Sequence, residues 1–242
     1  IAENAGTSLT LTATLSVATS ADVTVALSTS GTATEGTDYT DGSGAIDDIV
    51  ISAGATTGTV SFTPTDDSLY DAASNETATI AISGVTGGSA TESGTQTVTI
   101  TITDNESAPT LTLTTSGTSI AENSASTLTL TATLSGATYQ DVTVSIGSSG
   151  TATEGTDYGT VSDITISAGS TTGTASFDPT DDSVYEGNET AGISISGVSG
   201  GGASESGTQS VTITITENES APTVTLATSA TSIAENAGTS LT

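Results

Sequence analysis

Apolar and small polar residues alternate along much of the chain. In residues 8–15, 98–102 and 211–215, every second position is Leu, Ile, Val or Ala, and Thr or Ser stands between them. A period of two is typical of a strand with one buried and one exposed face, and β-branched residues favour that conformation. No long window shows the period of about 3.6 residues that marks an amphipathic helix. The pattern therefore predicts an all-β protein.

The sequence contains two long copies of one pattern and the start of a third. The tetrapeptide IAEN begins at Ile1, Ile120 and Ile233, and the segment GTATEGTDY begins at Gly31 and again at Gly150. Solenoid repeats recur about every 20–50 residues, which is much shorter than the separation of the IAEN copies along the sequence. The repeat therefore predicts tandem domains.

Apolar runs separated by Gly- and Ser-rich turns give the strand content of the complete second copy. These runs are residues 111–113 with Ile120, 128–134, 142–146, 164–166, 175–177, 193–195 and 211–215. Seven short strands within about 110 residues favour an immunoglobulin-like sandwich. We therefore expect tandem, antiparallel, seven-stranded immunoglobulin-like sandwiches joined end to end.

Two Ser-Ala-Pro joints set the expected boundaries. We expect sandwich 1 over residues 1–107, sandwich 2 over 108–221 and a C-terminal segment over 222–242. Sandwich 1 lacks the leading strand segment that sandwich 2 has at 110–119, and a counterpart of that segment stands at 223–232. Either the chain is a window of a longer tandem array, or the C-terminal segment is donated head to tail to another copy of the chain. Both hypotheses give a linear assembly.

All the charged side chains of this sequence are acidic. The 242 residues include 28 Asp and Glu and no Lys, Arg or His, so the formal net charge is −28. Without cationic side chains, the protein has nothing to neutralise phosphate groups, which disfavours nucleic acids and anionic membranes as partners. No stretch approaches the roughly 18 apolar residues of a membrane-spanning helix, so we expect no membrane insertion. The lack of His, Cys and Lys also excludes the common nucleophilic triads and His- or Cys-ligated metals.

The acidic residues concentrate in the connections after the first, third and fifth strands and at the chain's exit, which share one pole of an immunoglobulin-like sandwich. In sandwich 2 these residues are Glu122, Asp157, Asp181, Asp182, Glu186, Glu189, Glu217 and Glu219. In sandwich 1 they are Glu3, Asp38, Asp66, Asp67, Asp71, Glu76, Asp104 and Glu106. Such carboxylates repel one another, and no basic residue compensates. We therefore expect Ca²⁺, which takes about 6–8 oxygen ligands from flexible loops, at each pole. The alternative is a solvated acidic surface.

Three motifs, in order, resemble the Calx-β domain family. They are Gly-Thr-Ala-x-x-Gly-x-Asp-Tyr, Asp-Asp-x-x-Tyr-Glu-x-x-Glu and an acidic exit after Val-Thr-Ile-Thr-Ile. The resemblance covers essentially the whole chain. It implies a β-sandwich that binds Ca²⁺ through the acidic residues named above, as in the calcium-sensing domains of sodium–calcium exchangers and in bacterial surface and adhesin arrays. The exits differ from the family pattern of three consecutive acids, because Asn105 and Asn218 interrupt them.

The sequence predicts a non-enzymatic structural protein, a calcium-rigidified segment of an extracellular filament or adhesin stalk. Five Tyr and two Phe are few for the aromatic sugar platforms of a glycosidase that works with paired carboxylates. The alternative function is a calcium-dependent binding or sensor module, or a passive spacer within a larger surface adhesin. A sensor should respond near micromolar Ca²⁺, whereas a stalk should stay loaded at millimolar extracellular levels.

Overall fold

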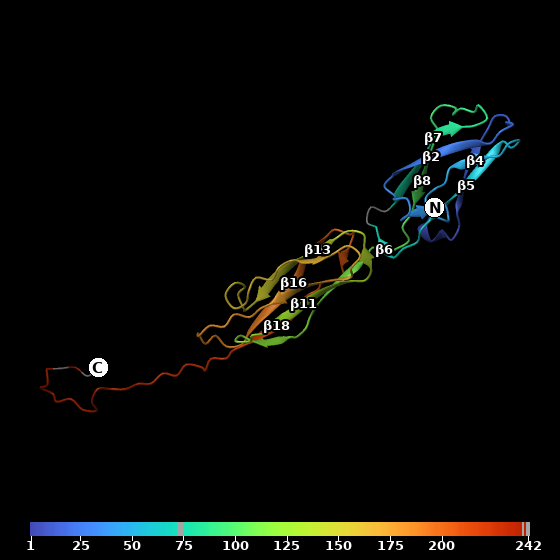
Figure 1. Ribbon diagram of the computed structural model, residues 1–242. Coiled ribbons are helices and arrows are strands. Elements are labelled where there is room, and N and C mark those ends of the chain that lie inside the picture. The colour runs from blue at the N-terminus through green and yellow to red at the C-terminus, as the bar shows by residue number, and fades with distance from the viewer. Residues whose placement is uncertain (72–74, 239, 241–242) are drawn as a thin grey trace.

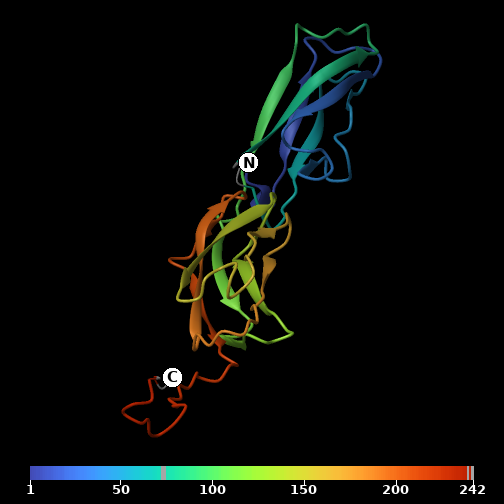
Figure 2. The ribbon, with the colours of Figure 1, turned by 90° about the vertical axis from the view of Figure 1, so that its left-hand side faces the viewer.

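The computed structural model describes residues 1–71, 75–238 and 240. Two β-sandwiches follow one another along a long axis, and the C-terminal segment extends from the far end of sandwich 2 (Figures 1 and 2). Helical structure among the described residues is confined to one 3-10 turn, η1 (Glu3–Ala5). The all-β prediction is confirmed. Within this described part of the chain, no helix is both long and apolar enough to cross a membrane.

Sandwich 1 is built from two antiparallel sheets. The first has the order β4-β2-β7-β8, from Ile49–Ile51, Val23–Gly31, Glu76–Thr86 and Thr97–Ile102. The second has the order β1-β5-β3, from Leu9–Thr14, Thr57–Pro64 and Tyr39–Thr40. In this second sheet β1 is an edge strand that pairs with β5 on one side, from Leu9 opposite Phe62 to Thr14 opposite Thr57.

Sandwich 2 repeats this plan with additional strands. Its first sheet has the order β10-β18-β16-β13-β14, from Ser119–Ala121, Ser210–Thr216, Glu189–Ser199, Val142–Gly150 and Ile164–Ile166. Its second sheet has the order β15-β11-β9-β17, from Thr172–Phe177, Leu128–Leu134, Thr110–Thr115 and Ser204–Glu205. The expected first apolar run, residues 111–113 with Ile120, is thus divided between β9 and β10, which belong to opposite sheets. Most pairings are antiparallel, but β10 with β18 and β17 with β9 are parallel.

The alternating apolar residues of each strand face the space between the two sheets. In sandwich 2 they form one continuous core, in which Leu111, Leu130, Phe177 and Ile193 are fully buried. Burying a side chain of this size contributes about 1.5–3 kcal/mol. The ring of Phe177 stacks on that of Tyr158 with 4.8 Å between their centroids, which anchors the loop before β14 to the core.

The two sandwiches meet through backbone contacts as well as through the covalent joint. Strand β12 (Ala137–Thr138) of sandwich 2 pairs in parallel with β6 (Leu69–Tyr70) of sandwich 1. The backbone N–H of Tyr139 then donates to the carbonyl of Tyr70 at 3.1 Å. Strand β6 belongs to the acidic loop of sandwich 1, so this loop contacts the next domain directly.

Candidate metal centres

Strand pairing brings three carboxylates together at the exit pole of sandwich 2. Glu122 directly follows β10, and Glu217 and Glu219 follow β18. These two strands are parallel neighbours, and the backbone N–H of Glu122 continues the ladder by donating to the carbonyl of Thr216 at 3.1 Å. As a result, one carboxylate oxygen from each of Glu122, Glu217 and Glu219 lies within 4.8 Å of the others.

The carboxylate of Glu217 organises this exit. The backbone N–H groups of Glu186 and Gly187 donate to its Oε2 at 2.6 and 2.8 Å, and that of Glu219 donates to its Oε1 at 3.0 Å. These backbone donors, that of Glu219 first, lower the pKa of Glu217 to about 2. Glu217 is therefore a fixed anion that ties the acidic loop after β15 to the end of the last strand.

Glu122 and Glu219 each have one carboxylate oxygen without a hydrogen-bond partner in the described part of the chain. Oε1 of Glu122 and Oε2 of Glu219 are buried and accept no hydrogen bond among the described residues. Burial, the hydrogen bond with Glu219 and the charge of Glu217 raise the pKa of Glu122 to about 8. A buried polar oxygen without a partner is costly. These oxygens fit a cation, which would satisfy both of them and reduce the repulsion.

A second group of carboxylates lies at the same pole. Asp157, Glu186 and Glu189 also place one oxygen each within 4.8 Å of one another. Asp157 is held by the turn that precedes the buried Tyr158, because its Oδ2 accepts the backbone N–H of Thr153 at 2.6 Å. Burial and the neighbouring Asp157 raise the pKa of Glu189. This group is therefore a second candidate cation site in sandwich 2.

Sandwich 1 has a related group at its exit, in which Asp67 from the acidic loop takes the place of Asp104, the counterpart of Glu217. Glu3, Asp67 and Glu106 place one carboxylate oxygen each within 4.8 Å of one another. Burial and the hydrogen bond with Glu106 raise the pKa of Glu3 to about 8, and Oε2 of Glu106 is buried without a partner among the described residues. The backbone N–H of Asn105 donates to Oε1 of Glu3 at 3.3 Å. The two exits therefore share two corresponding carboxylates, Glu3 with Glu122 and Glu106 with Glu219.

The counterpart of the second group in sandwich 1 lies around Glu76. Burial and the charges of Asp38 and Asp71 raise the pKa of Glu76 to about 7. The backbone N–H of Asp71 donates to Oδ2 of Asp104 at 2.7 Å, which links this loop to the exit. Within the described part of sandwich 1, only the Glu3 group meets the 4.8 Å spacing, and residues 72–74 of the loop lie outside the description.

The remaining predicted acids border these groups. The side-chain amide of Asn218 donates to Oδ1 of Asp181 at 3.2 Å, which places Asp181 beside the Glu122 group. Oδ1 of Asp182 accepts the backbone N–H of Val184 at 2.6 Å and so shapes its own loop. The negative charge of Asp66 acts on the Glu106 carboxylate in the direction that raises its pKa. The structure thus gathers the predicted acids at two poles, and their role as ligands stays a prediction.

Two contributors were missed by the sequence analysis. Asn188 accepts the backbone N–H of Glu217 through Oδ1 at 3.0 Å and so fixes the exit strand to the loop. Tyr139 of sandwich 2 lines a small hollow in sandwich 1 together with Glu3, Asp67 and Glu76. Tyr139 carried no signal in the sequence, because its counterpart in sandwich 1 is Ser20.

Comparisons with known proteins find one matching family model and a set of similar solved structures. The Calx-beta domain model matches residues 1–106 and 104–219. A crystal structure of CBD12 from CALX1.2 is 16% identical with a TM-score of 0.39, covering 89% of this chain and 95% of that one. An apo-form Calx CBD1 domain is 19% identical with a TM-score of 0.38, covering 46% and 99%. Invasin, a bacterial integrin-binding protein, is 15% identical with a TM-score of 0.37, covering 89% and 37%. No curated protein matches the chain. The two matched segments span almost the whole sequence, and the chain belongs to the Calx-beta domain family.

Proposed function

We propose that this protein is a non-enzymatic structural segment of an extracellular filament or adhesin stalk, in which Ca²⁺ at the pole of each sandwich stiffens the joint to the next domain. The observation that carries the proposal is the position of the Glu3, Asp67 and Glu106 group. Glu106 belongs to the segment that leads into sandwich 2, and Asp67 precedes strand β6, which pairs with sandwich 2. A cation held here would fix both connections between the domains.

The chemistry of the ligands favours Ca²⁺. Glu3, Asp67 and Glu106 would hold one cation in sandwich 1, and Glu122, Glu217 and Glu219 would hold one in sandwich 2. All these ligands are carboxylate oxygens on loops or strand ends, which suit Ca²⁺ with its flexible coordination better than Mg²⁺ with its strict octahedron. Bound Ca²⁺ supplies the positive charge that the chain lacks. The chain's own residues orient the oxygens and transmit the constraint to the joint.

The exposure of the carboxylates supports an extracellular placement. Extracellular calcium modules bind with dissociation constants of about 10⁻⁴–10⁻³ M, whereas sensors work at about 10⁻⁷–10⁻⁵ M. Each group here has three carboxylates, and in the Glu3 group the carboxylate of Asp67 is exposed. Partial exposure weakens the attraction between a carboxylate and a cation, because water screens it. The proposed sites therefore match millimolar calcium outside the cell.

The proposal is tested by measuring the joint directly. Because the chain has no Cys, spin labels can be placed at Val98→Cys in sandwich 1 and Ser170→Cys in sandwich 2, both of which are exposed. We expect a narrow distribution of label distances in millimolar Ca²⁺ and a broad one in EDTA. Asp67→Asn keeps the acceptor for the backbone N–H of Leu69 but removes the charge, so it should broaden the distribution even with Ca²⁺. Asp47→Asn, which removes a carboxylate at an exposed position outside the predicted sites, is the matched control.

Two results would contradict the proposal. If the width of the distance distribution is the same in Ca²⁺ and in EDTA, calcium does not stiffen the joint. If the change is half complete at micromolar Ca²⁺, the protein is a calcium sensor instead of a permanently loaded stalk.

A further inference from the structure

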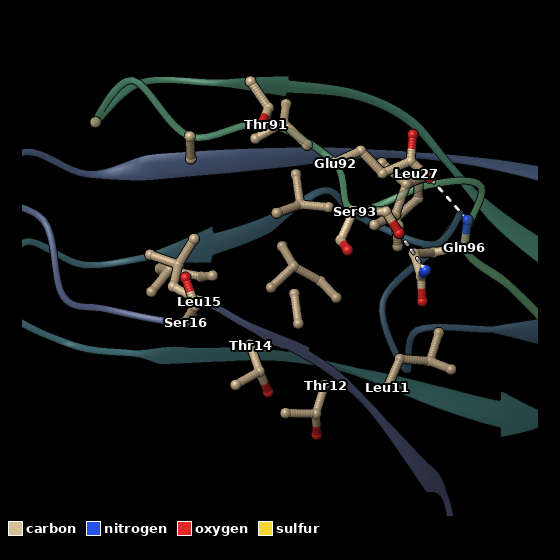
Figure 3. A pocket seen from close by; sticks show the side chains of 18 of the residues that line it. Leu11, Thr12, Thr14, Leu15, Ser16, Leu27, Thr91, Glu92, Ser93 and Gln96 are labelled. Atoms are coloured by element: carbon tan, nitrogen blue, oxygen red, sulfur yellow. Dashed lines mark hydrogen bonds between the residues drawn. The ribbon is translucent and has the colours of Figure 1, made fainter.

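Sandwich 1 has an open apolar groove where sandwich 2 has a strand. The groove has a volume of about 750 Å³ and runs along the free edge of β1. Figure 3 shows Leu11 and Leu15 on one side of the groove, with Glu92, Ser93 and Gln96 on the opposite rim. In sandwich 2 the corresponding strand, β11, has no free edge, because β9 pairs with it over five residues from Leu130 to Leu134.

The cores of the two copies differ at this place. Leu130, Ala132 and Leu134 of β11 are buried, whereas their counterparts Leu11, Ala13 and Leu15 are only half-buried. Sandwich 2 has one continuous core that includes Leu111 and Leu113 of β9, but the core of sandwich 1 is divided into two clusters. Among the described residues, no strand pairs with the free edge of β1, the place that β9 takes beside β11 in sandwich 2.

The C-terminal segment contains a counterpart of this strand. Residues 223–228 read TVTLAT, and β9 reads TLTLTT. In β9, Leu111 and Leu113 are 0% and 4% exposed, whereas Val224 and Leu226 of the C-terminal segment are 97% and 101% exposed. Two fully exposed apolar side chains with a period of two indicate a strand without a sheet.

We propose that residues 223–228 of one copy insert as an antiparallel strand into the groove of sandwich 1 of a second copy and complete its sheet. The pairing of β9 with β11 sets the register. By this correspondence Val224 lies opposite Leu15, Leu226 opposite Ala13, and both side chains enter the groove. The mode is β-strand addition, in which backbone hydrogen bonds hold the strand and alternate side chains fill the groove.

The polar groups that hold β9 in sandwich 2 are also present around the groove. In sandwich 2 the backbone N–H of Ser206 donates to the carbonyl of Leu111 at 2.9 Å, and that of Leu113 donates to Oε1 of Gln209 at 3.4 Å. Ser135 Oγ accepts the backbone N–H of Thr110 at 2.9 Å.

The counterparts of these three residues in sandwich 1 are Ser93, Gln96 and Ser16. Ser93 and Gln96 form the rim of the groove, and Ser16 lies at its end. The groove therefore offers the same donors and acceptors to residues 223–226 that sandwich 2 offers to β9.

A separate surface supports the same contact. At the joint between the sandwiches, Leu69 and Tyr70 pair with Ala137 and Thr138. Their counterparts in sandwich 2, Val184 and Tyr185, are 59% and 45% exposed. In the proposed assembly these two residues meet residues 18–19 of the second copy, the counterparts of β12, and become covered in the same way.

The occupant is a second copy, because the chain's own groove is out of reach. The C-terminal segment leaves sandwich 2 at the end remote from sandwich 1 in both views (Figures 1 and 2). The sequence Asn-Glu-Ser-Ala-Pro stands both at the covalent joint, residues 105–109, and before the inserted strand, residues 218–222. The second copy thus follows sandwich 2 as sandwich 2 follows sandwich 1. Such a heterologous contact extends into an open line.

The first experiment measures the mass of the full 242-residue chain by sedimentation velocity over a wide concentration range. We expect linear oligomers that grow with concentration. Leu226→Glu places a charge in the groove and should abolish oligomers even at concentrations 100-fold above the wild-type midpoint. Thr225→Glu is the matched control, because its counterpart Thr112 points to solvent, and it should shift the midpoint by less than threefold. A wild-type chain that stays monomeric, or equal effects of the two substitutions, would overturn the proposal.

The second experiment tests the register and the identity of the partner. A Thr14→Cys chain is mixed with a Thr225→Cys chain and oxidised, and these positions correspond to Thr133 and Thr112, which lie opposite each other. We expect a covalent dimer. Replacing the first partner by Thr12→Cys moves the cysteine two residues along the strand, to about 7–8 Å, beyond the reach of a disulfide. Equal yields from both pairs would refute the register. Because the contact needs no cation, both experiments are run in Ca²⁺ and in EDTA, which separates this proposal from the calcium proposal.

Discussion

Glu122 is the side chain at which proton binding and cation binding compete in sandwich 2. Burial and its carboxylate neighbours raise its pKa to about 8 from an ordinary value of 4.5. Most of the protein therefore carries a proton on Glu122 at pH 7, and a cation that binds among Glu122, Glu217 and Glu219 must displace that proton. Glu122→Gln keeps the shape of the protonated acid and removes the exchangeable proton.

The pKa of Glu122 sets the expected size of the effect. A group with a pKa of about 8 is about 90% protonated at pH 7 and about 99% protonated at pH 6. The apparent affinity of this site for Ca²⁺ should therefore be about tenfold lower at pH 7 than at alkaline pH, and about a hundredfold lower at pH 6. In the Glu122→Gln variant this pH dependence should disappear, and about one proton fewer should be released per chain at pH 7.

Isothermal titration calorimetry with Ca²⁺ measures both quantities. Titrations at pH 6, 7 and 8 give the affinities, and repetition in two buffers with different heats of ionisation gives the number of protons released. Glu92→Gln makes the same chemical change at an exposed position outside the acidic groups and should behave as the wild type. A wild-type affinity that is equal at pH 6 and pH 8, or a Glu122→Gln variant that releases as many protons as the wild type, would refute the coupling.

Three further predictions concern stability. The pKa values of Glu3 and Glu122 are raised to about 8 from 4.5, so proton binding stabilises the metal-free fold fully below pH 4.5, and this contribution is lost as the pH rises through 8. Calorimetry in EDTA should therefore show Tm falling from pH 5 to pH 8. Added Ca²⁺ should remove this pH dependence of Tm. Leu130→Ala should cost about 3–5 kcal/mol in urea unfolding, while the half-buried Leu11→Ala should cost about 1 kcal/mol; equal costs would contradict an incomplete core in sandwich 1. Gly150→Ala should destabilise far more than Gly155→Ala, because both have positive φ but a Cβ at Gly150 would lie 2.0 Å from the carbonyl oxygen of Thr190.

The strands of this fold can be predicted from the sequence because each has one buried face. Alternation with Thr marks β11 and β18 without ambiguity. Alternation tells which residues share a face but not which sheet a strand joins. For this reason the run that contains Leu111 and Ile120 was expected as one strand, although the chain crosses from one sheet to the other between them.

The candidate sites were predictable as a pole but not as separate groups. The order of strands in an immunoglobulin-like sandwich brings the acidic connections together, and the structure shows this for Glu122 and Glu217. The division into groups depends on backbone donors inside the loops, such as the N–H of Gly187, which holds Oε2 of Glu217 at 2.8 Å. No pattern of residue types specifies such a contact. Tyr139 was unpredictable for another reason, since it acts across the joint on the preceding domain.

The placement of the acids also explains why the proposed assembly is head to tail. The carboxylate groups of each sandwich gather at its exit pole, and each exit pole faces the entry pole of the next domain, as the pairing of β6 with β12 shows. A symmetric dimer joined through the exit poles would place two such groups against each other, and each pair of like charges at 4 Å costs about 1 kcal/mol even in water. A heterologous contact avoids this repulsion. With a net charge of −28, the chain can therefore extend into a line through unlike poles, and the inserted strand and the cation act on the same joint.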